Sequence, residues 1–179
     1  MEEHDINTVF QEANRKLALK APGYIVRNAS IDDIERVIYI NQVSLPEHYP
    51  RGFYEDLLEH WGKAFYVAVD PDGNVVGYIM NRVEYKPGFF KYLIVKSGHV
   101  VSIAVLQEHR NKGLGYALMA YAMRTLYEEY RCNETYLEVR VSNKPAISLY
   151  EKLGYKIVKI EKGYYLDGED AYVMARKLP

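Results

Sequence analysis

Hydrophobic residues follow two spacings along this chain, and the spacing separates expected helices from expected strands. Apolar side chains recur every three or four residues where a helix is expected, and short continuous or alternating apolar runs mark strands. The expected helices cover residues 6–17, 34–41, 53–61, 114–126 and 145–153. The expected strands cover residues 24–28, 64–69, 75–85, 99–106, 134–141, 155–162 and 172–177, with a loop at 87–98. After residue 22 the order β-α-α-β-β-β-α-β-α-β-β predicts an α/β fold with a mixed sheet flanked by helices.

The length of 179 residues fits one domain with a sizeable core. The segment before Pro22 is expected to be a separate unit, because Ile6, Val9, Phe10, Ala13 and Leu17 fall on one helical face. We therefore expect residues 1–22 to be a helical extension that docks on the domain or on a partner, and residues 23–179 to be the single domain.

The strand expected at 99–106 is almost entirely apolar, which is typical of a strand buried on both faces. Between it and the next helix lies the run Arg110-Asn111-Lys112-Gly113-Leu114-Gly115. Glycines allow close backbone approach, and the free N–H groups and dipole at a helix start favour anions. Two cationic side chains add positive charge at the same place. This loop is therefore predicted to bind phosphate.

Two other interpretations of the loop compete with a specific phosphate site. The loop does not fit the P-loop pattern, and as a dinucleotide fingerprint it lacks the third glycine. Glu138 lies at a plausible distance downstream for a ribose contact. The missing glycine therefore weakens the interpretation as a dinucleotide-binding module but does not eliminate it. The glycines could also simply begin a helix.

The pattern R-x-x-G-x-G between a strand and a helix resembles the acetyl-coenzyme A pyrophosphate loop of the GNAT N-acetyltransferase superfamily. Residues 136–143 and 145–155 resemble the second half of that superfamily. Residues 162–172 and 45–50 are similar to the tail and early loop of protein N-terminal acetyltransferases, namely RimI-like enzymes and the NatA catalytic subunit. The resemblance covers roughly residues 24–178.

The resemblance implies transfer of an acetyl group from acetyl-coenzyme A to the N-terminal α-amino group of proteins. It implies that the loop 110–115 binds the pyrophosphate, that Ile103, Ala104 and Val105 line the pantetheine arm, and that Asn143 and Tyr150 lie near the thiol. A main-chain N–H near Val105 would meet the oxyanion if the strand bulges or splays there.

An α-amino group has a pKa near 7.7–8.0, against about 10.4 for lysine, so a weak base suffices for an N-terminal amine. His99 and Glu138 lie at similar points of adjacent expected strands, and either could be the base through a water. Tyr150 could return a proton to the thiolate or could only pack the helix on the sheet. Which of His99 and Glu138 is the base stays open.

Two loops are expected to form walls around the first residues of the substrate. By resemblance, the early loop and the tail loop form these walls, and side chains in and near them are expected to bind the peptide. These side chains are Leu45, Glu47, Tyr49, Arg140, Tyr164 and Tyr165.

The composition and charge of the chain limit which classes of binding partner are expected. The net charge of −1 implies no general affinity for nucleic acid, and no apolar run is long enough to span a membrane. A single cysteine, Cys132, excludes a Cys-based zinc cluster and fits a cytoplasmic protein. The acidic residues Glu2 and Glu3 have the wrong charge for a secretory signal, which also favours the cytoplasm. No metal is expected. The ribosome or an auxiliary subunit could be a partner, and acetylation of lysine or small amines, or silent acyl-coenzyme A binding, remain alternatives.

Overall fold

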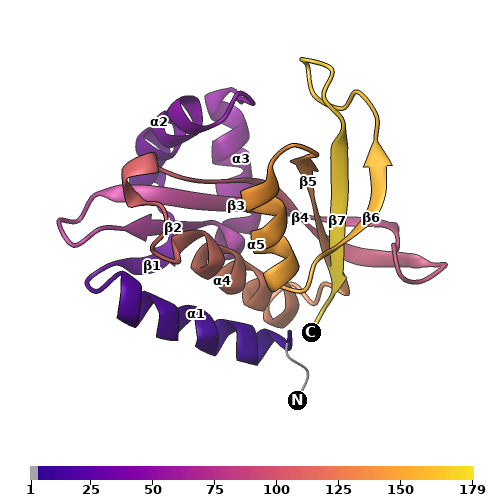
Figure 1. Cartoon of the computed structure of the whole chain (residues 1–179), viewed down its shortest axis with the longest axis horizontal. Coiled ribbons are helices and arrows are strands. Elements are labelled where there is room, and N and C mark those ends of the chain that lie inside the picture. The colour runs from indigo at the N-terminus through magenta and orange to yellow at the C-terminus, as the bar shows by residue number, and fades with distance from the viewer. Residues whose placement is uncertain (1–3) are drawn as a thin grey trace.

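The computed structural model describes residues 4–179 and leaves Met1, Glu2 and Glu3 outside that description. One seven-stranded sheet runs through the molecule in the order β1-β2-β3-β4-β5-β7-β6 (Figure 1). Its strands are β1 (Ile25–Asn28), β2 (Tyr66–Val69), β3 (Val75–Pro87), β4 (Ile94–Val105), β5 (Glu134–Arg140), β6 (Lys156–Glu161) and β7 (Ala171–Lys177). The central neighbours β4 and β5 run parallel, and the other pairs run antiparallel.

Helices cover the two faces of the sheet unequally. They are α1 (Ile6–Lys20), α2 (Ile34–Ser44), α3 (Arg51–Trp61), α4 (Leu114–Glu128) and α5 (Lys144–Lys152). In Figure 1, α4 and α5 lie in front of the sheet and α2 and α3 behind it, with α1 along the outside of α4. The element order expected after residue 22 is confirmed.

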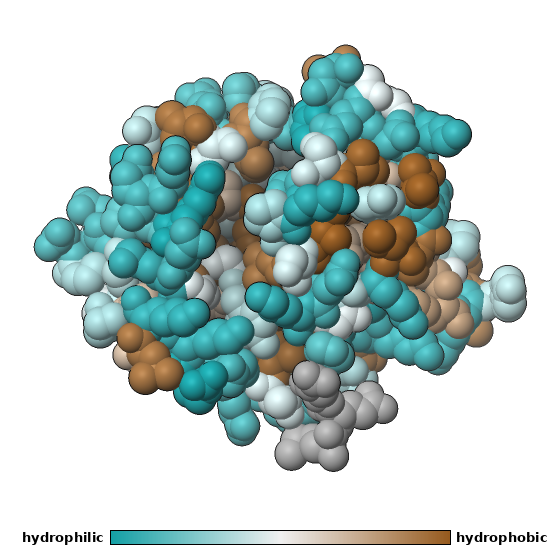
Figure 2. All heavy atoms as spheres, viewed as in Figure 1, coloured by the Kyte–Doolittle hydropathy of each residue, from teal (hydrophilic) through white to brown (hydrophobic). Residues whose placement is uncertain are grey.

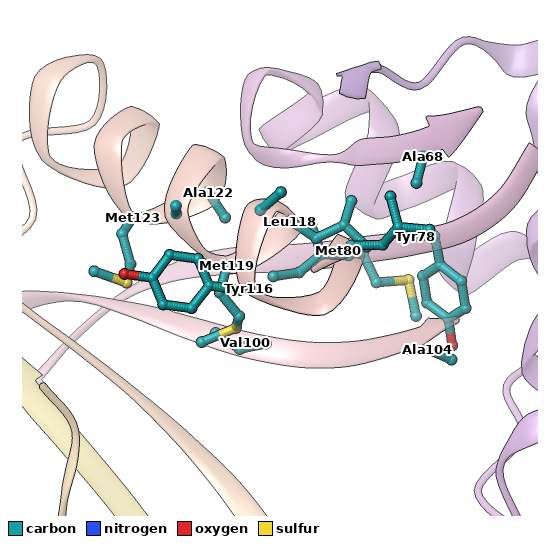
Figure 3. Packing of buried hydrophobic residues seen from close by; sticks show 14 of the residues in the cluster. Ala68, Tyr78, Met80, Val100, Ala104, Tyr116, Leu118, Met119, Ala122 and Met123 are labelled. Carbon is teal, nitrogen blue, oxygen red and sulfur yellow. The ribbon is translucent and has the colours of Figure 1, made fainter. Parts of the chain in front are cut away.

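The helix α4 is apolar almost all round because it is packed on two sides. Toward the sheet, Leu118, Met119 and Met123 are fully buried among residues of β3 and β4 (Figure 3). Toward solvent it is covered by α1, where Tyr121 donates a hydrogen bond to Asn14 at 2.7 Å. Tyr121 thus lies between α1 and the sheet, because its ring also packs edge-on against Tyr66 of β2, with centroids 5.6 Å apart.

The expected N-terminal helix is confirmed as α1. The Asp5 side chain accepts a hydrogen bond from the backbone N–H of Asn7 at 3.1 Å, which caps the helix. Its apolar face (Ile6, Val9, Ala13 and Leu17) is buried in the same hydrophobic core as the sheet. Among residues 4–179, no helix combines the length and apolar character that crossing a membrane requires.

The loop expected at 87–98 is confirmed only for residues 88–93. β3 continues to Pro87, and β4 begins at Ile94, so a long hairpin occupies most of this stretch. Lys96, Ser97 and Gly98 interrupt the apolar pattern, and this hid the first part of β4. Gly98 serves packing, because a Cβ there would lie 2.6 Å from Leu126 Cδ1 on α4.

A bulge in β4 exchanges the faces on which its side chains lie. The register with β3 passes from Met80↔Ser102 to Asn81↔Val100 and so skips Val101. Before the bulge Gly98 faces α4, which places His99 on the opposite face. After the bulge Ala104 is paired with Tyr78, whose hydroxyl bonds to Asn41 of α2.

The residues that alternate with Ala104 therefore face the α4 side. Ile103 and Val105 are only partly buried there, and Val101 at the bulge is also partly exposed. The expectation that this strand is buried on both faces is wrong, because the apolar side chains on the α4 side border an open groove.

Candidate active site

The parallel strands β4 and β5 separate in the middle of the sheet. Their pairing runs from Ser97↔Glu134 to His99↔Tyr136. Beyond that point β4 stays with β3 as far as Val105, and β5 stays with β7 as far as Arg140. The gap opens between α5 and the loop before α4, where Figure 2 shows a hollow with hydrophobic residues in its floor.

The structure brings His99 and Glu138 together at the start of this gap. His99 Nε2 lies 2.7 Å from Glu138 Oε1 and 3.1 Å from Oε2. His99 is opposite Tyr136 in the register, and Glu138 follows two residues later on the same face of β5. Both side chains are largely buried, so this is a desolvated imidazole–carboxylate pair able to take up a proton.

Three further residues, which the sequence interpretation missed, lie around His99. The Tyr136 ring stacks on the imidazole with centroids 4.4 Å apart and an angle of 3°, and its hydroxyl donates to Glu84 on β3. Arg82, opposite His99 in the register, lies 4.0 Å from Glu84. In the sequence, Arg82 and Glu84 stand at alternate positions near the end of a strand that is otherwise mostly apolar, and this pattern could have indicated that they belong to a site.

A cavity of about 330 Å³ opens beside the pair on the face that carries His99. Its lining combines cations, carboxylates and aromatic rings from β3, β4, β5, β6, β7 and the loop before β7. The lining residues are Arg82, Lys86, Phe89, His99, Tyr136, Glu138, Lys159, Glu161, Tyr164 and Val173. Its volume is sufficient for several water molecules next to Glu138.

Tyr164 forms part of the rim of this cavity. Its hydroxyl lies 3.4 Å from Glu138 Oε1 and donates to that oxygen. Burial, together with the neighbouring carboxylate of Glu138, raises the pKa of Tyr164 to about 12. The phenol therefore stays protonated at neutral pH and is a hydrogen-bond donor at the rim.

The loop 110–115 has the backbone expected of an anion site. Gly113 has φ +84° and begins α4, and Asn111 has φ +62°. Arg110 Nε donates to the carbonyl oxygen of Val105 at 2.9 Å, which fixes the guanidinium at the end of β4. Gly115 allows α5 to approach, because a Cβ there would lie 3.3 Å from Leu149 Cδ2. Free N–H groups of the first turn of α4 thus lie near the Arg110 guanidinium, while Lys112 Nζ lies 5.9 Å from the centroid of the Tyr24 ring.

The two residues expected near the thiol both belong to α5. The Asn143 side-chain oxygen accepts from the backbone N–H of Ala146 at 3.3 Å and caps the helix, which leaves its amide N–H groups for another partner. Tyr150 is buried in the core, 6.2 Å from the Tyr155 ring, and burial raises the pKa of its phenol. Packing alone accounts for the position of Tyr150.

Arg140 joins the two expected walls instead of offering a free cation to a substrate, which differs from the expectation. Its guanidinium lies 2.7 Å from Glu47 in the loop between α2 and α3. It also lies 2.9 Å from Asp167 and 3.0 Å from Glu169 in the loop between β6 and β7. The Tyr165 ring lies 4.0 Å from the same guanidinium. We call this set of five residues the Arg140 clamp.

The early loop is also tied to β4. The Tyr49 hydroxyl donates to the carbonyl oxygen of Val101 at 3.4 Å, and its ring stacks on Phe53. His48 lies 2.8 Å from the carbonyl oxygen of Leu45, which orders the start of the loop. Tyr49 thus reaches the bulge itself, which places this wall beside the gap.

The strand irregularity lies earlier than expected. Val105 is paired with Gly77 in the regular ladder, and its carbonyl oxygen is taken by Arg110. Of the two conditions named for a donor near Val105, the splay is present there, because β4 and β5 pair only as far as His99↔Tyr136, and the bulge lies earlier, at Val101.

Comparisons with known proteins agree with this geometry. The profile of the Acetyltransferase (GNAT) family matches residues 31–155. The chain is 52% identical over 161 residues to an N-alpha-acetyltransferase of Saccharolobus solfataricus, which covers 89% of this chain and 96% of that protein. The crystal structure of Ard1 from Thermoplasma volcanium superimposes with a TM-score of 0.75 at 32% identity, covering 88% of this chain and 99% of that one.

The structure of the NatB acetyltransferase complex bound to CoA and MES superimposes with a TM-score of 0.72 at 28% identity. It covers 87% of this chain and 99% of that chain. Three findings indicate the same family. They are the profile match over more than half of the chain, the relative of 52% identity and the splayed central strands. The chain belongs to the GNAT acetyltransferase family.

Proposed function

We propose that this protein transfers the acetyl group of acetyl-coenzyme A to the N-terminal α-amino group of proteins. One observation carries the proposal: β4 holds the His99–Glu138 pair on one face of the sheet, changes faces at the Val101 bulge and ends at Val105, where Arg110 of the anion loop is fixed. A thioester held on the α4 side and an amine held on the cavity side would approach each other through the gap between β4 and β5.

The residues of the α4 side fit a coenzyme A ester. The loop 110–115 supplies main-chain donors and the cations Arg110 and Lys112 for the diphosphate. Ile103 and Val105 offer partly exposed apolar side chains for the pantetheine arm, with Ala104 buried between them. Main-chain N–H groups at the bulge would serve as oxyanion donors, each typically worth about 10²–10³ in rate.

The residues of the cavity side fit a weakly basic amine. The His99–Glu138 pair would take the amine proton directly or through a water in the cavity, and Tyr164 would hold the amine or the first peptide group. Tyr150 would return a proton to the thiolate as a buried phenol. The first side chain of the substrate would lie between Glu47 and Tyr49 on one wall and Tyr165 on the other.

The relatives support the substrate class and a role for partners. The Saccharolobus relative is named for α-amine acetylation, and the NatB structure is that of a complex. We propose protein N-termini as substrates, with the ribosome or an auxiliary subunit as a docking partner for the face formed by α1. Cys132 is buried as a free thiol, which fits action in a reducing, cytoplasmic setting.

The first test compares amines. Peptides with a free or a blocked N-terminus, each carrying one internal lysine, are incubated with acetyl-coenzyme A while thiol release is measured. We expect release only with the free N-terminus, because its pKa is more than two units below that of lysine. Equal release from blocked peptides would assign the activity to lysine, and binding of acetyl-coenzyme A without turnover of any amine would indicate a silent binder.

The second test concerns the phosphate loop. Gly113→Ala forces a side chain into φ +84°, which costs roughly 1–2 kcal/mol, and Arg110→Ala removes a fixed cation. We expect each to weaken acetyl-coenzyme A binding about tenfold in calorimetry while peptide KM changes less.

Gly73→Ala is the matched control, since Gly73 has φ +87° in the turn between β2 and β3, away from the loop. Gly73→Ala should destabilise the protein comparably without changing cofactor affinity. Unchanged affinity in both loop variants would contradict the loop assignment.

A further inference from the structure

A carboxylate faces each nitrogen of the His99 imidazole. Nε2 is hydrogen-bonded to Glu138, and Nδ1 lies 3.7 Å from Glu84 Oε1. Within residues 4–179, Nδ1 is buried and has no hydrogen-bond partner at this distance. A buried imidazole nitrogen normally has a partner, and Glu84 is the acidic group placed to become one.

Tyr136 fixes both of the groups concerned. Its ring lies flat on the imidazole, and its hydroxyl donates to Glu84. Burial, with Glu84 contributing, raises the pKa of Tyr136, so the phenol remains a donor and Glu84 accepts as a carboxylate. One side chain thus sets the plane of the imidazole and the position of the second carboxylate.

Glu84, at the β3 end of this row, is the most exposed of the three side chains. The side chain of His99 is 9% exposed, that of Glu138 is 14% and that of Glu84 is 29%. A proton that reaches Glu84 is therefore closer to bulk water than a proton held at the His99–Glu138 pair.

We propose, on the basis of the proposed function, that Glu138, His99 and Glu84 form a relay that carries the amine proton out of the cleft. The amine nitrogen loses its proton to Glu138. Glu138 passes a proton to Nε2 while the Nδ1 proton passes to Glu84, which releases it to solvent. One proton enters from the amine and one leaves through Glu84, and His99 is left with its proton on Nε2. The starting tautomer returns when water in the cavity takes the Nε2 proton and solvent returns one proton to Nδ1 through Glu84, so that each cycle releases one net proton. Glu84 is a positioning residue, because it acts through His99 and does not touch the substrate.

The groups around His99 come from three parts of the fold. They are Arg82 and Glu84 on β3, Tyr136 and Glu138 on β5, Tyr164 before β7, and Lys86 at the outer end of β3. Glu84→Gln keeps the size of the side chain and its acceptor for Tyr136 but cannot take a proton. The substitution therefore removes the last proton acceptor of the relay with little change in packing.

The experiment measures peptide turnover by Glu84→Gln with saturating acetyl-coenzyme A. We expect kcat to fall about tenfold or more, the solvent deuterium isotope effect on kcat to rise, and the KM for acetyl-coenzyme A to stay the same. Nitrogen NMR of the histidine rings gives a readout without turnover: the His99 titration should shift while those of His60 and His109 stay in place. Glu84→Asp, which restores a carboxylate, should recover part of the rate.

Glu129→Gln is the control for loss of a surface carboxylate, since Glu129 pairs with Lys63 on a remote face. A Glu84→Gln enzyme with unchanged kcat, isotope effect and His99 titration would overturn the relay. If the wild-type protein acetylates lysine and not free N-termini, the proposed function fails, but the relay is still tested by the His99 titration.

Discussion

Glu138→Gln is expected to lower kcat for peptide acetylation by about 10²–10⁴, the usual range for loss of a general base. Glutamine keeps the shape of the side chain and can still accept from Tyr164, but it cannot take up a proton. Because Glu138 and His99 are 2.7 Å apart, they act as one unit. His99→Gln should therefore cost a comparable factor, and the double variant should be no more than about tenfold worse than the poorer single variant.

Single-turnover rates of the three variants, measured across pH 6–9, test this expectation. His60→Gln on the outer face of α3 is the control for loss of an imidazole remote from the cleft. A Glu138→Gln enzyme within threefold of wild type would remove Glu138 from the chemistry. Fully multiplicative losses in the double variant would show that the two residues act independently.

Arg140→Met is expected to raise peptide KM by more than tenfold and to lower kcat/KM by about 10²–10³, with little change in acetyl-coenzyme A affinity. The substitution leaves the carboxylates of Glu47, Asp167 and Glu169 facing one another without a cation. Like charges held together repel, so the loop 45–50 and the loop between β6 and β7 should separate. The substrate cleft then loses both walls, and misplacement of about 1 Å can cost about 10² in rate.

Arg27→Met is the matched control. Arg27 lies on β1, away from the cleft, and its guanidinium donates two hydrogen bonds to the carboxylate of Asp33. The measurements are steady-state kinetics with varied peptide concentration and limited proteolysis of the loop between β6 and β7. An Arg140→Met enzyme with wild-type peptide KM would refute the role of the Arg140 clamp.

The Arg140 clamp also has a defined pH range. A hydrogen bond from the backbone of residue 169 and then Arg140 hold the pKa of Asp167 below its ordinary value. Ser142 and then Arg140 do the same for Glu169. Groups with lowered pKa stabilise the folded loop above their unfolded pKa and lose this effect as the pH falls through the folded value. Loop order should therefore be constant through the neutral range and fall only below about pH 4.

The sequence by itself determined the order of elements after residue 22, the phosphate loop and the pairing of candidate bases. These features depend on local or periodic signals. Two glycines, of which Gly113 has positive φ, two cations and a helix start lie within six residues. The spacing of apolar residues in two strands places His99 and Glu138 at matching points. Such signals survive in a single sequence because neighbouring residues produce them.

Only the tertiary structure decided which residues face each other across the cleft. The bulge at Val101, which moves His99 to one face and Ile103 to the other, depends on the register of β4 against β3. The use of Arg140 in a clamp depends on two loops that are 120 residues apart in the chain, at Glu47 and Asp167. Glu84 becomes a neighbour of His99 only through the hairpin whose strands the polar residues 96–98 concealed. These features are set by strand register and long-range contacts, and no local pattern in the chain encodes either.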